Sequence, residues 1–208
     1  MVDNFDLIKQ HLDFKNDQSF YFVQILRRKK ENPEMKSYSI PIESFYIFNK
    51  EDFDRYKPHI IDKCEANRAR AYIKMNCLDA QSVLLEQIAI ITQDIRKKNW
   101  KGMSKTLNSA CGICGKQEGY EKLYLVDLDR ELADKRDEIR NLINSLPPVD
   151  VTEKVKMEIP TKNGYHFLTT GFNHNDFRKL YQGIDIHDDG ITLLYFPSCC
   201  DFLTTEQK

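Results

Sequence analysis

Two aspartates stand one residue apart at the end of an apolar segment in KLYLVDLDRE, residues 122–131. The segment from Leu123 to Val126 is typical of a β-strand, and side chains two positions apart on a strand point to the same side of a sheet. Asp127 and Asp129 can therefore converge on one hard cation such as Mg²⁺ or Mn²⁺, whose usual ligands are carboxylate oxygens and substrate phosphates. The alternative is that Asp129 caps the following helix and that Asp127 ends the strand in water.

A second group of polar residues stands in PTKNGYHFLT, residues 160–169. Gly164 precedes His166 by two positions at the start of an apolar strand, and a glycine there would let the backbone approach a ligand closely. Lys162, Asn163 and His166 are suitable donors to phosphate oxygens. The alternative is an ordinary hairpin turn followed by a histidine that points outward from the strand.

Together the two motifs resemble the archaeo-eukaryotic primase superfamily, which includes primase-polymerases and the polymerase domains of bacterial end-joining ligases. Its members carry a hydrophobic-D-h-D motif and, farther along, a small residue, one variable residue and His. YLVDLD and GYH match these motifs, and the resemblance covers roughly residues 69–200. It implies that Asp127 and Asp129 bind metal, that His166 contacts a nucleoside triphosphate, and that the catalytic half is an RRM-like α+β sheet. Fragments of the chain also look like small proteins of phages and their bacterial hosts, which implies no activity.

The chain departs from the family pattern at the third acidic residue, which the family places on a later strand. The final apolar strand, ITLLYFPS, contains none. Asp185 in GIDIHDDG is the best substitute, with Asp188 and Asp201 behind it. If none of these reaches the metal, two-metal phosphoryl transfer is in doubt, whereas metal and nucleotide binding could remain. The same aspartate-rich segment also suits a turn between two strands, and we expect the turn.

Basic residues cluster in several segments, although a net charge of −1 argues against a general polyanion-binding protein. Arg68, Arg70 and Lys74 lie on or beside a strand expected at residues 69–76, next to the strand that ends in the two aspartates. They are candidates for phosphate or template contacts, and ordinary surface charge is the alternative for each. The basic loop QILRRKKENPEMK could likewise contact a nucleic-acid backbone or simply be solvated.

Six cysteines occur without a secretory signal, so we expect reduced thiols in the cytoplasm, or in a bacterial host cell if the chain is phage-encoded. Cys111 and Cys114 have zinc-knuckle spacing, but a structural zinc needs four ligands. The nearest further pair, Cys199 and Cys200, is distant in sequence, so zinc is not expected. No apolar run approaches the roughly 18–20 residues that span a bilayer, so no membrane contact is expected.

The hydrophobic pattern predicts an α+β fold, with an RRM-like mixed sheet and packed helices after an N-terminal αβ extension. We expect residues 1–68 to form the extension and 69–208 the RRM-like, catalytic-type domain, in one compact unit. Segments 19–28 and 36–48 indicate a β-hairpin, further strands are expected at 123–127, 155–160, 164–172 and 191–197, and 99–121 reads as irregular. The clearest helix is 78–99, with an apolar stripe at helical spacing formed by Val83, Leu84, Ile88, Ile91 and Ile95. Other helices are expected at 51–66, where Pro58 would end or kink the segment, at 130–145 and at 175–181.

The sequence therefore predicts a primase-polymerase-like nucleotidyltransferase of DNA replication that uses Mg²⁺ or Mn²⁺. It would bind a nucleoside triphosphate and act on a DNA or RNA template or primer, with a replication-protein partner to help it engage the template. One alternative is a non-catalytic phage-type protein that keeps the fold to bind nucleic acid, a nucleotide or a protein. Another is metal-dependent hydrolysis of a phosphate ester by the same acidic cluster. Asp185 discriminates, because a position within metal-ligand reach of Asp127 would support catalysis.

Overall fold

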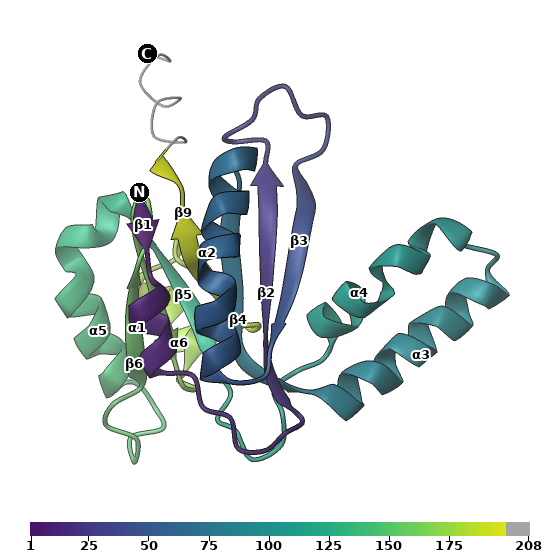
Figure 1. The fold of residues 1–208 in the computed structure, drawn as a ribbon. Helices are drawn as coiled ribbons and strands as arrows, with labels where there is room; N and C mark the ends of the chain where they lie inside the picture. Colours follow the sequence, from purple (N-terminus) through teal and green to yellow (C-terminus); the bar gives the residue numbers. More distant parts are fainter. Residues whose placement is uncertain (199–208) are drawn as a thin grey trace.

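The computed structural model describes residues 1–198 and contains two antiparallel β-sheets with helices around them (Figure 1). The first sheet has the strand order β1-β9-β4-β2-β3, formed by Val2–Asp3, Ile191–Phe196, Arg70–Asp79, Ser19–Arg28 and Ser39–Ile47. The second has the order β6-β7-β5-β8, formed by Val155–Pro160, Gly164–Thr169, Tyr124–Asp129 and Asp185–His187. The predicted α+β class is confirmed.

Strands from both sides of residue 68 share the first sheet. The hairpin β2–β3 has Phe22 paired with Tyr46, and β2 also pairs with β4, where Val23 lies opposite Ile73. The expectation of one sheet in the domain from residue 69 onward is wrong, because β4 and β9 belong to the first sheet and β5 to β8 form the second. The pairings described are antiparallel in both sheets, so the sheet is not of mixed type. The proposed division of the chain into two domains stays a prediction.

Six α-helices and two 3₁₀ segments accompany the sheets within residues 1–198. Their bounds are Phe5–Gln10 (α1), Lys50–Asn67 (α2), Ala80–Arg96 (α3), Trp100–Lys105 (η1), Thr106–Ile113 (α4), Arg130–Lys135 (η2), Arg136–Ser145 (α5) and His174–Leu180 (α6). Helix α2 continues past Pro58 instead of ending there. The segment expected to be irregular contains η1 and α4, so that expectation is wrong for residues 100–113.

The hydrophobic core explains how the two sheets are joined. Helices α1 and α2 pack on one face of the first sheet, and Leu125 and Leu168 of the second sheet belong to the same buried cluster. The opposite face of the second sheet places Val126, Leu128 and Phe167 against α5 and α6. Alternate residues of β5 therefore face different layers, and the side that carries Leu125 also carries both aspartates.

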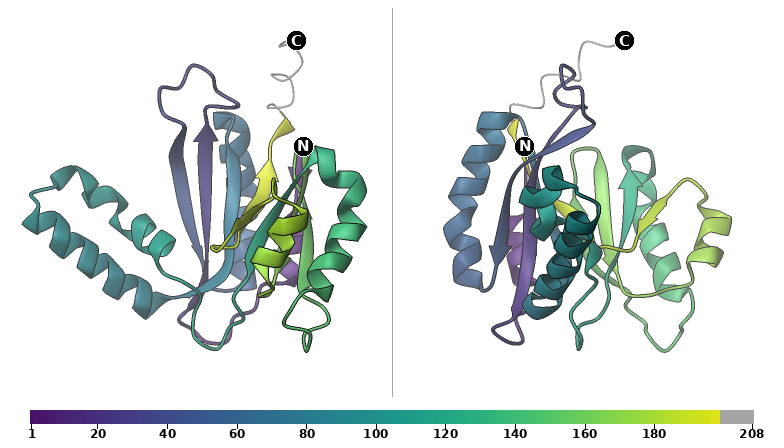
Figure 2. Two further views of the ribbon diagram at one scale, coloured as in Figure 1. Left: turned by 180° about the vertical axis from the view of Figure 1, so that it is seen from behind. Right: turned by 90° about the vertical axis from the view of Figure 1, so that its right-hand side faces the viewer.

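Helices α3 and α4 form a hairpin that extends away from the two sheets (Figures 1 and 2). Its base is held by a small cluster in which Val83 and Ala110 pack with Phe20 and Phe22 of β2. Beyond that base, most of the apolar side chains of α3 are exposed. Within residues 1–198, no helix has the length and apolar character needed to cross a bilayer.

Candidate functional site

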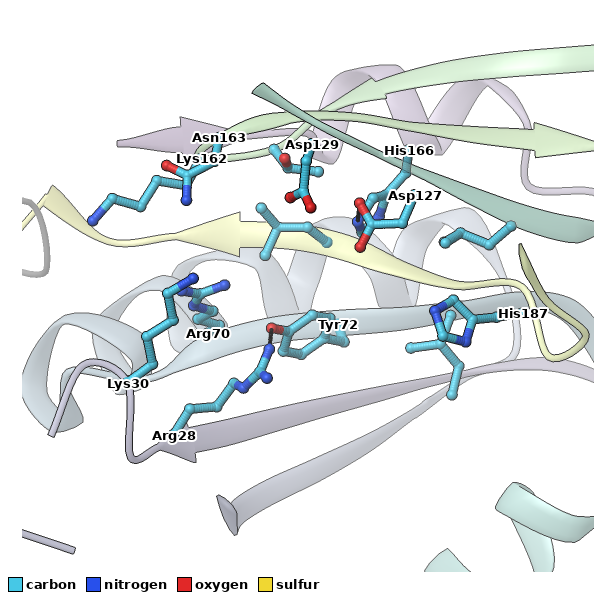
Figure 3. A pocket seen from close by; sticks show the side chains of 14 residues that line it. Arg28, Lys30, Arg70, Tyr72, Asp127, Asp129, Lys162, Asn163, His166 and His187 are labelled. Carbon is cyan, nitrogen blue, oxygen red and sulfur yellow. Dashed lines mark hydrogen bonds and ion pairs between the residues drawn. The ribbon is translucent and has the colours of Figure 1, made fainter. Parts of the chain in front are cut away.

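A cavity of about 300 Å³ lies between the two sheets and gathers most of the polar residues that the sequence singles out (Figure 3). Its lining contains acidic side chains, histidines, basic side chains and a few apolar ones. The lining residues are Arg28, Lys30, Arg70, Tyr72, Leu125, Asp127, Asp129, Thr161, Lys162, Asn163, His166, His187, Ile191 and Leu193.

One wall of the cavity comes from the second sheet. Asp127 and Asp129 point into the cavity from β5, as expected for side chains two positions apart on a strand (Figure 3). Strand β7 is the neighbour of β5, with His166 opposite Asp127 and Gly164 opposite Asp129. The loop between β6 and β7 adds Lys162 and Asn163 at the same wall. The two sequence motifs are therefore adjacent in space because of one strand pairing.

His166 is held between the two sheets. Its Nε2 lies 3.4 Å from Oδ1 of Asp127, and its Nδ1 lies 2.9 Å from the hydroxyl oxygen of Thr192 on β9. A carboxylate only accepts hydrogen bonds, so Nε2 must carry the proton when it bonds to Asp127. Contact with His166 holds the pKa of Asp127 below its usual value, against the opposing effect of burial. The Asp127 carboxyl group therefore stays charged to a lower pH than an ordinary aspartate does.

Gly164 is needed for the close pairing of β7 with β5. A Cβ atom at this position would lie 1.9 Å from the carbonyl oxygen of Leu128, on the neighbouring strand. Such a contact is impossible, so only glycine lets β7 lie this close to β5 beside Asp129. The expectation that Gly164 also lets the backbone approach a ligand stays a prediction. The glycine also stands where the loop with Lys162 and Asn163 ends and β7 begins.

The opposite wall comes from the first sheet and is basic. The guanidinium of Arg28 on β2 donates hydrogen bonds to the hydroxyl oxygens of Tyr72, at 3.0 Å, and Tyr38, at 2.7 Å. Lys30 follows β2 and extends over the same side of the cavity (Figure 3). A cluster of carboxylates therefore faces a cluster of cations across the cavity, an arrangement that suits a metal ion on one side and phosphate oxygens on the other.

Arg70 lines the cavity but is already engaged. It forms an ion pair with Glu31, a residue that is only 4% exposed. Its guanidinium also lies 4.8 Å from the ring centre of Phe196, and the ammonium of Lys162 lies 4.8 Å from the same ring centre. Arg70 and Lys162 are thus held near each other across the end of β9. Glu31 neutralises much of the charge that Arg70 could offer to a phosphate.

Two predicted basic contacts do not reach the cavity. Arg68 ends helix α2 in a left-handed conformation, with φ of 46°, and is not among the residues that line the cavity. Lys74 lies on the same face of β4 as Tyr72, but its ammonium donates to the carbonyl oxygens of Cys111, at 2.9 Å, and Cys114, at 2.7 Å. Its role is to hold the C-terminal end of α4, so the expectation of a phosphate or template contact by Lys74 is wrong.

Asp185 is paired in register with Asp127, on the strand on the other side of β5. Directly opposed residues of an antiparallel pair point to the same face, so Asp185 shares the face of the candidate ligands. It is exposed, however, and does not line the cavity. Residues 185–187 form β8 rather than the expected turn, which is confined to residues 188–190.

Among the other acidic candidates, Asp188 does not line the cavity. Asp188 is exposed and lies 3.6 Å from the ammonium of Lys122, and Asp201 lies outside the described residues. Within residues 1–198, no three side chains of His, Cys, Asp or Glu are arranged as a complete metal cage. Asp127 and Asp129 would therefore need oxygen ligands from a substrate or from water, which is the common situation for Mg²⁺.

The cysteines take part in packing. Cys111 is fully buried, and burial raises its pKa to about 12. Cys77, Cys111 and Cys114 are free thiols in the described part of the chain. Cys199 and Cys200 lie outside it. Cys64, Cys77 and Cys111 therefore supply buried apolar contacts, and Cys114 is half-buried.

Sequence reasoning missed several lining residues. Arg28 and Lys30 belong to a segment that the sequence marks only as a basic loop. An arginine at the end of a strand, followed by lysines, was the one available signal of a binding site there. Tyr72 and His187 had no signal beyond their strand patterns. Thr192 looked like any β-branched strand residue, and only the structure places its hydroxyl beside His166.

Comparisons with protein-family models, with curated proteins and with solved structures give no match for this chain. A functional assignment therefore depends on the side chains of the cavity and on their geometry.

Proposed function

We propose that the cavity binds a divalent metal ion together with a nucleoside triphosphate and that the protein transfers a nucleotide to a nucleic-acid primer or template. The proposal rests on one observation: two walls of opposite charge face each other across the cavity. Asp127, Asp129 and His166 lie on one side, and Arg28 and Lys30 lie on the other. A metal–triphosphate complex presents both kinds of charge that such walls bind.

The second sheet adds support at the level of topology. Its elements follow the order β5-α5-β6-β7-α6-β8, and its strands lie in the order β6-β7-β5-β8. We infer an RRM-like βαββαβ unit over residues 124–187, smaller than the domain expected from the sequence. The aspartate pair is then on its first strand and His166 on its third. This arrangement agrees with the resemblance to the primase-polymerase superfamily.

The residues would divide the chemistry as follows. Asp127 and Asp129 would hold Mg²⁺ or Mn²⁺, which supplies charge stabilisation for the attacking and leaving oxygens. A cation at Asp127 would replace the contact of Asp127 with His166, which frees Nε2 of His166 to donate to a phosphate oxygen. Thr192 would keep the ring in position from Nδ1. Arg28 and Lys30 would neutralise phosphate charge from the other wall.

Primer extension tests this proposal. Labelled deoxy- and ribonucleoside triphosphates, Mn²⁺ or Mg²⁺, and primed or unprimed single-stranded templates would be supplied to the wild type and to Asp127→Asn. Asp188→Asn is the matched control, because it removes a carboxylate outside the cavity. We expect metal-dependent incorporation that is lost in Asp127→Asn and kept in Asp188→Asn. Incorporation that persists in Asp127→Asn would refute the assignment.

A second candidate is a non-catalytic phage-type protein that binds a nucleotide or nucleic acid through the same cavity. The favouring observation is that Asp185, the best third carboxylate, lies outside the cavity lining. Under this alternative, the wild type binds a metal–nucleotide complex yet incorporates no nucleotide and releases no phosphate. Release of inorganic phosphate without incorporation would instead favour the hydrolytic alternative.

A further inference from the structure

The α3–α4 hairpin exposes an apolar stripe on the side of α3 that does not pack against α4. Leu84, Ile88, Ile91 and Ile95 are 52, 60, 39 and 57% exposed. Leu85, beside them, is 59% exposed. The partners of α3 among the described elements are chiefly α4, η1 and β4. These lie toward the other side of the helix, where Val83 and Ile90 are packed.

The spacing of this stripe is that of a coiled-coil seam. Leu84, Ile88, Ile91 and Ile95 are separated by four, three and four residues, which are the intervals between the a and d positions of a heptad. Any apolar face of a helix has intervals of three and four residues. A second helix fits them well, because its side chains enter the holes between successive turns.

The stripe is also symmetric about its centre. In an antiparallel pair of α3 helices related by a twofold axis near residues 89 and 90, Leu84 lies opposite the partner's Ile95. Ile88 then lies opposite the partner's Ile91. Each a position thus meets a d position, as antiparallel coiled coils require, and all four apolar residues are paired at once. The same patch on both chains makes a closed, isologous interface.

Charge favours the same orientation. The helix ends at Arg96 and is followed by its C-cap Lys97 and by Lys98, three positive charges against the one negative charge of Asp94. The N-terminal half carries Glu86 and is preceded by the N-cap Asp79. In the antiparallel pair, the basic end of one chain lies beside the partner's residues 81–83, between its Asp79 and Glu86. A parallel pair would bring the two basic ends together. The helix dipoles also oppose each other in the antiparallel pair.

We infer that α3 is a dimerisation helix and that two copies of this chain associate through an antiparallel, twofold α3–α3 contact. The hairpin extends away from the sheets (Figures 1 and 2), so the bodies of the two copies stay apart and their cavities remain open. Because α3 has only 17 residues, a length of about 25 Å, the contact is at the small end of stable interfaces. We therefore expect a weak dimer, with a dissociation constant in the micromolar range.

Sedimentation equilibrium tests the inference up to about 500 µM, a concentration well above a micromolar dissociation constant. The wild type should shift with concentration from 24.5 kDa toward twice that mass. Ile88→Glu and Ile91→Lys should each remain monomeric, because a charge then faces an isoleucine across the seam. Leu180→Glu is the control, because Leu180 is 66% exposed but lies on α6, and it should dimerise as the wild type does.

Mixing the two variants tests the orientation. An Ile88→Glu chain and an Ile91→Lys chain should form a heterodimer, because the antiparallel register places the new Glu opposite the new Lys. In a parallel pair these side chains would face isoleucines, and mixing would restore nothing. A wild type that stays monomeric throughout, single variants that still dimerise, or a mixture that stays monomeric would each overturn the inference. Far-ultraviolet circular dichroism would confirm that every variant is folded.

Discussion

Asp127, His166 and Thr192 form a chain of contacts from the second sheet to the first. The ring of His166 is only 13% exposed, whereas the Asp127 side chain is 41% exposed. The His166 end of this series of contacts is thus fixed inside the protein, and the Asp127 end is open to the cavity. A carboxylate held in this way keeps its charge and its orientation before any ligand arrives, which reduces the cost of binding a cation.

His166→Ala should raise the pKa of Asp127 toward its ordinary value, because contact with His166 is the main cause of its lowering. A lowered pKa in the folded state means that Asp127 adds stability at pH above about 3.9, its unfolded value. That contribution is lost as the pH falls through the lower folded pKa. Carbon NMR titration of the carboxyl group measures the shift directly. His187→Ala is the control, with a smaller effect expected, and an unchanged pKa in His166→Ala would contradict the account.

Gly164→Ala should destabilise the protein by about 1–3 kcal/mol, the usual range for an inserted methyl group in a packed site. The added carbon would meet the carbonyl oxygen of Leu128 at 1.9 Å, so β7 must move away from β5. Urea unfolding measures the change. Gly183→Ala is the matched control, because a Cβ at Gly183 has no atom within 4 Å. Equal stability of the two variants would show that β7 tolerates the methyl group.

At the scale of elements, α4 depends on a contact from a distant strand. The ammonium of Lys74 donates to carbonyl oxygens near the C-terminal end of the helix, those of Cys111 and Cys114 and, at 3.4 Å, that of Gly112. The backbone there lacks donors of its own. Burial lowers the pKa of Lys74, and the carbonyl oxygens that surround the group compensate its burial. The base of the α3–α4 hairpin is fixed to the first sheet in this way.

Lys74→Met keeps the length of the side chain but removes its donors, so these carbonyl oxygens lose their partner. A net cost of about 1–3 kcal/mol is expected for a buried group left without a hydrogen bond. Hydrogen exchange of the α4 amides should accelerate more than that of α2. Lys116→Met is the control, because Lys116 is exposed and should change neither rate. Unchanged protection of α4 in Lys74→Met would rule out this role.

Elements with a strong local pattern could be predicted, and those that depend on distant contacts could not. The hairpin β2–β3, strand β5 and helix α3 follow from alternation or helical periodicity within one segment. The two glycines near the end of α4 favour an irregular segment when the sequence alone is considered. The helix is held by Lys74, which lies 37 residues away in sequence, so no local pattern indicates it. The sequence likewise gives no local signal that β4 and β9 belong to a different sheet from β5, because the pattern within one strand does not indicate which strand it pairs with.

At the scale of the whole molecule, the cavity exists because two sheets meet along one side of a shared core. The acidic wall could be predicted, since Asp127 and Asp129 are close in sequence and lie on one strand. The basic wall could not, because Arg28 is about a hundred residues away in the chain and reaches the cavity only through the pairing of β2 with β4. The site thus joins residues from both ends of the sequence.

Lys30→Ala should weaken binding of a metal–nucleotide complex by up to about fivefold, because an exposed ion pair contributes about 0.2–1 kcal/mol. It should leave binding of the metal alone unchanged, because Lys30 is on the phosphate side of the cavity. Lys29→Ala is the matched control, since Lys29 is also exposed but does not line the cavity. Fluorescence titration with a labelled nucleotide compares the three proteins. An equal effect of the two variants would indicate general attraction rather than a defined site.

The most direct test of the central claim is isothermal titration of a nucleoside triphosphate into the protein, with and without Mn²⁺. The wild type, the double variant Asp127→Ala/Asp129→Ala and the control Asp188→Ala/Asp189→Ala would be compared. The account predicts nucleotide binding that requires Mn²⁺, disappears in the first double variant and is kept in the control. Absence of binding in the wild type, or equal binding in the first double variant, would contradict the claim that these two carboxylates form the metal site.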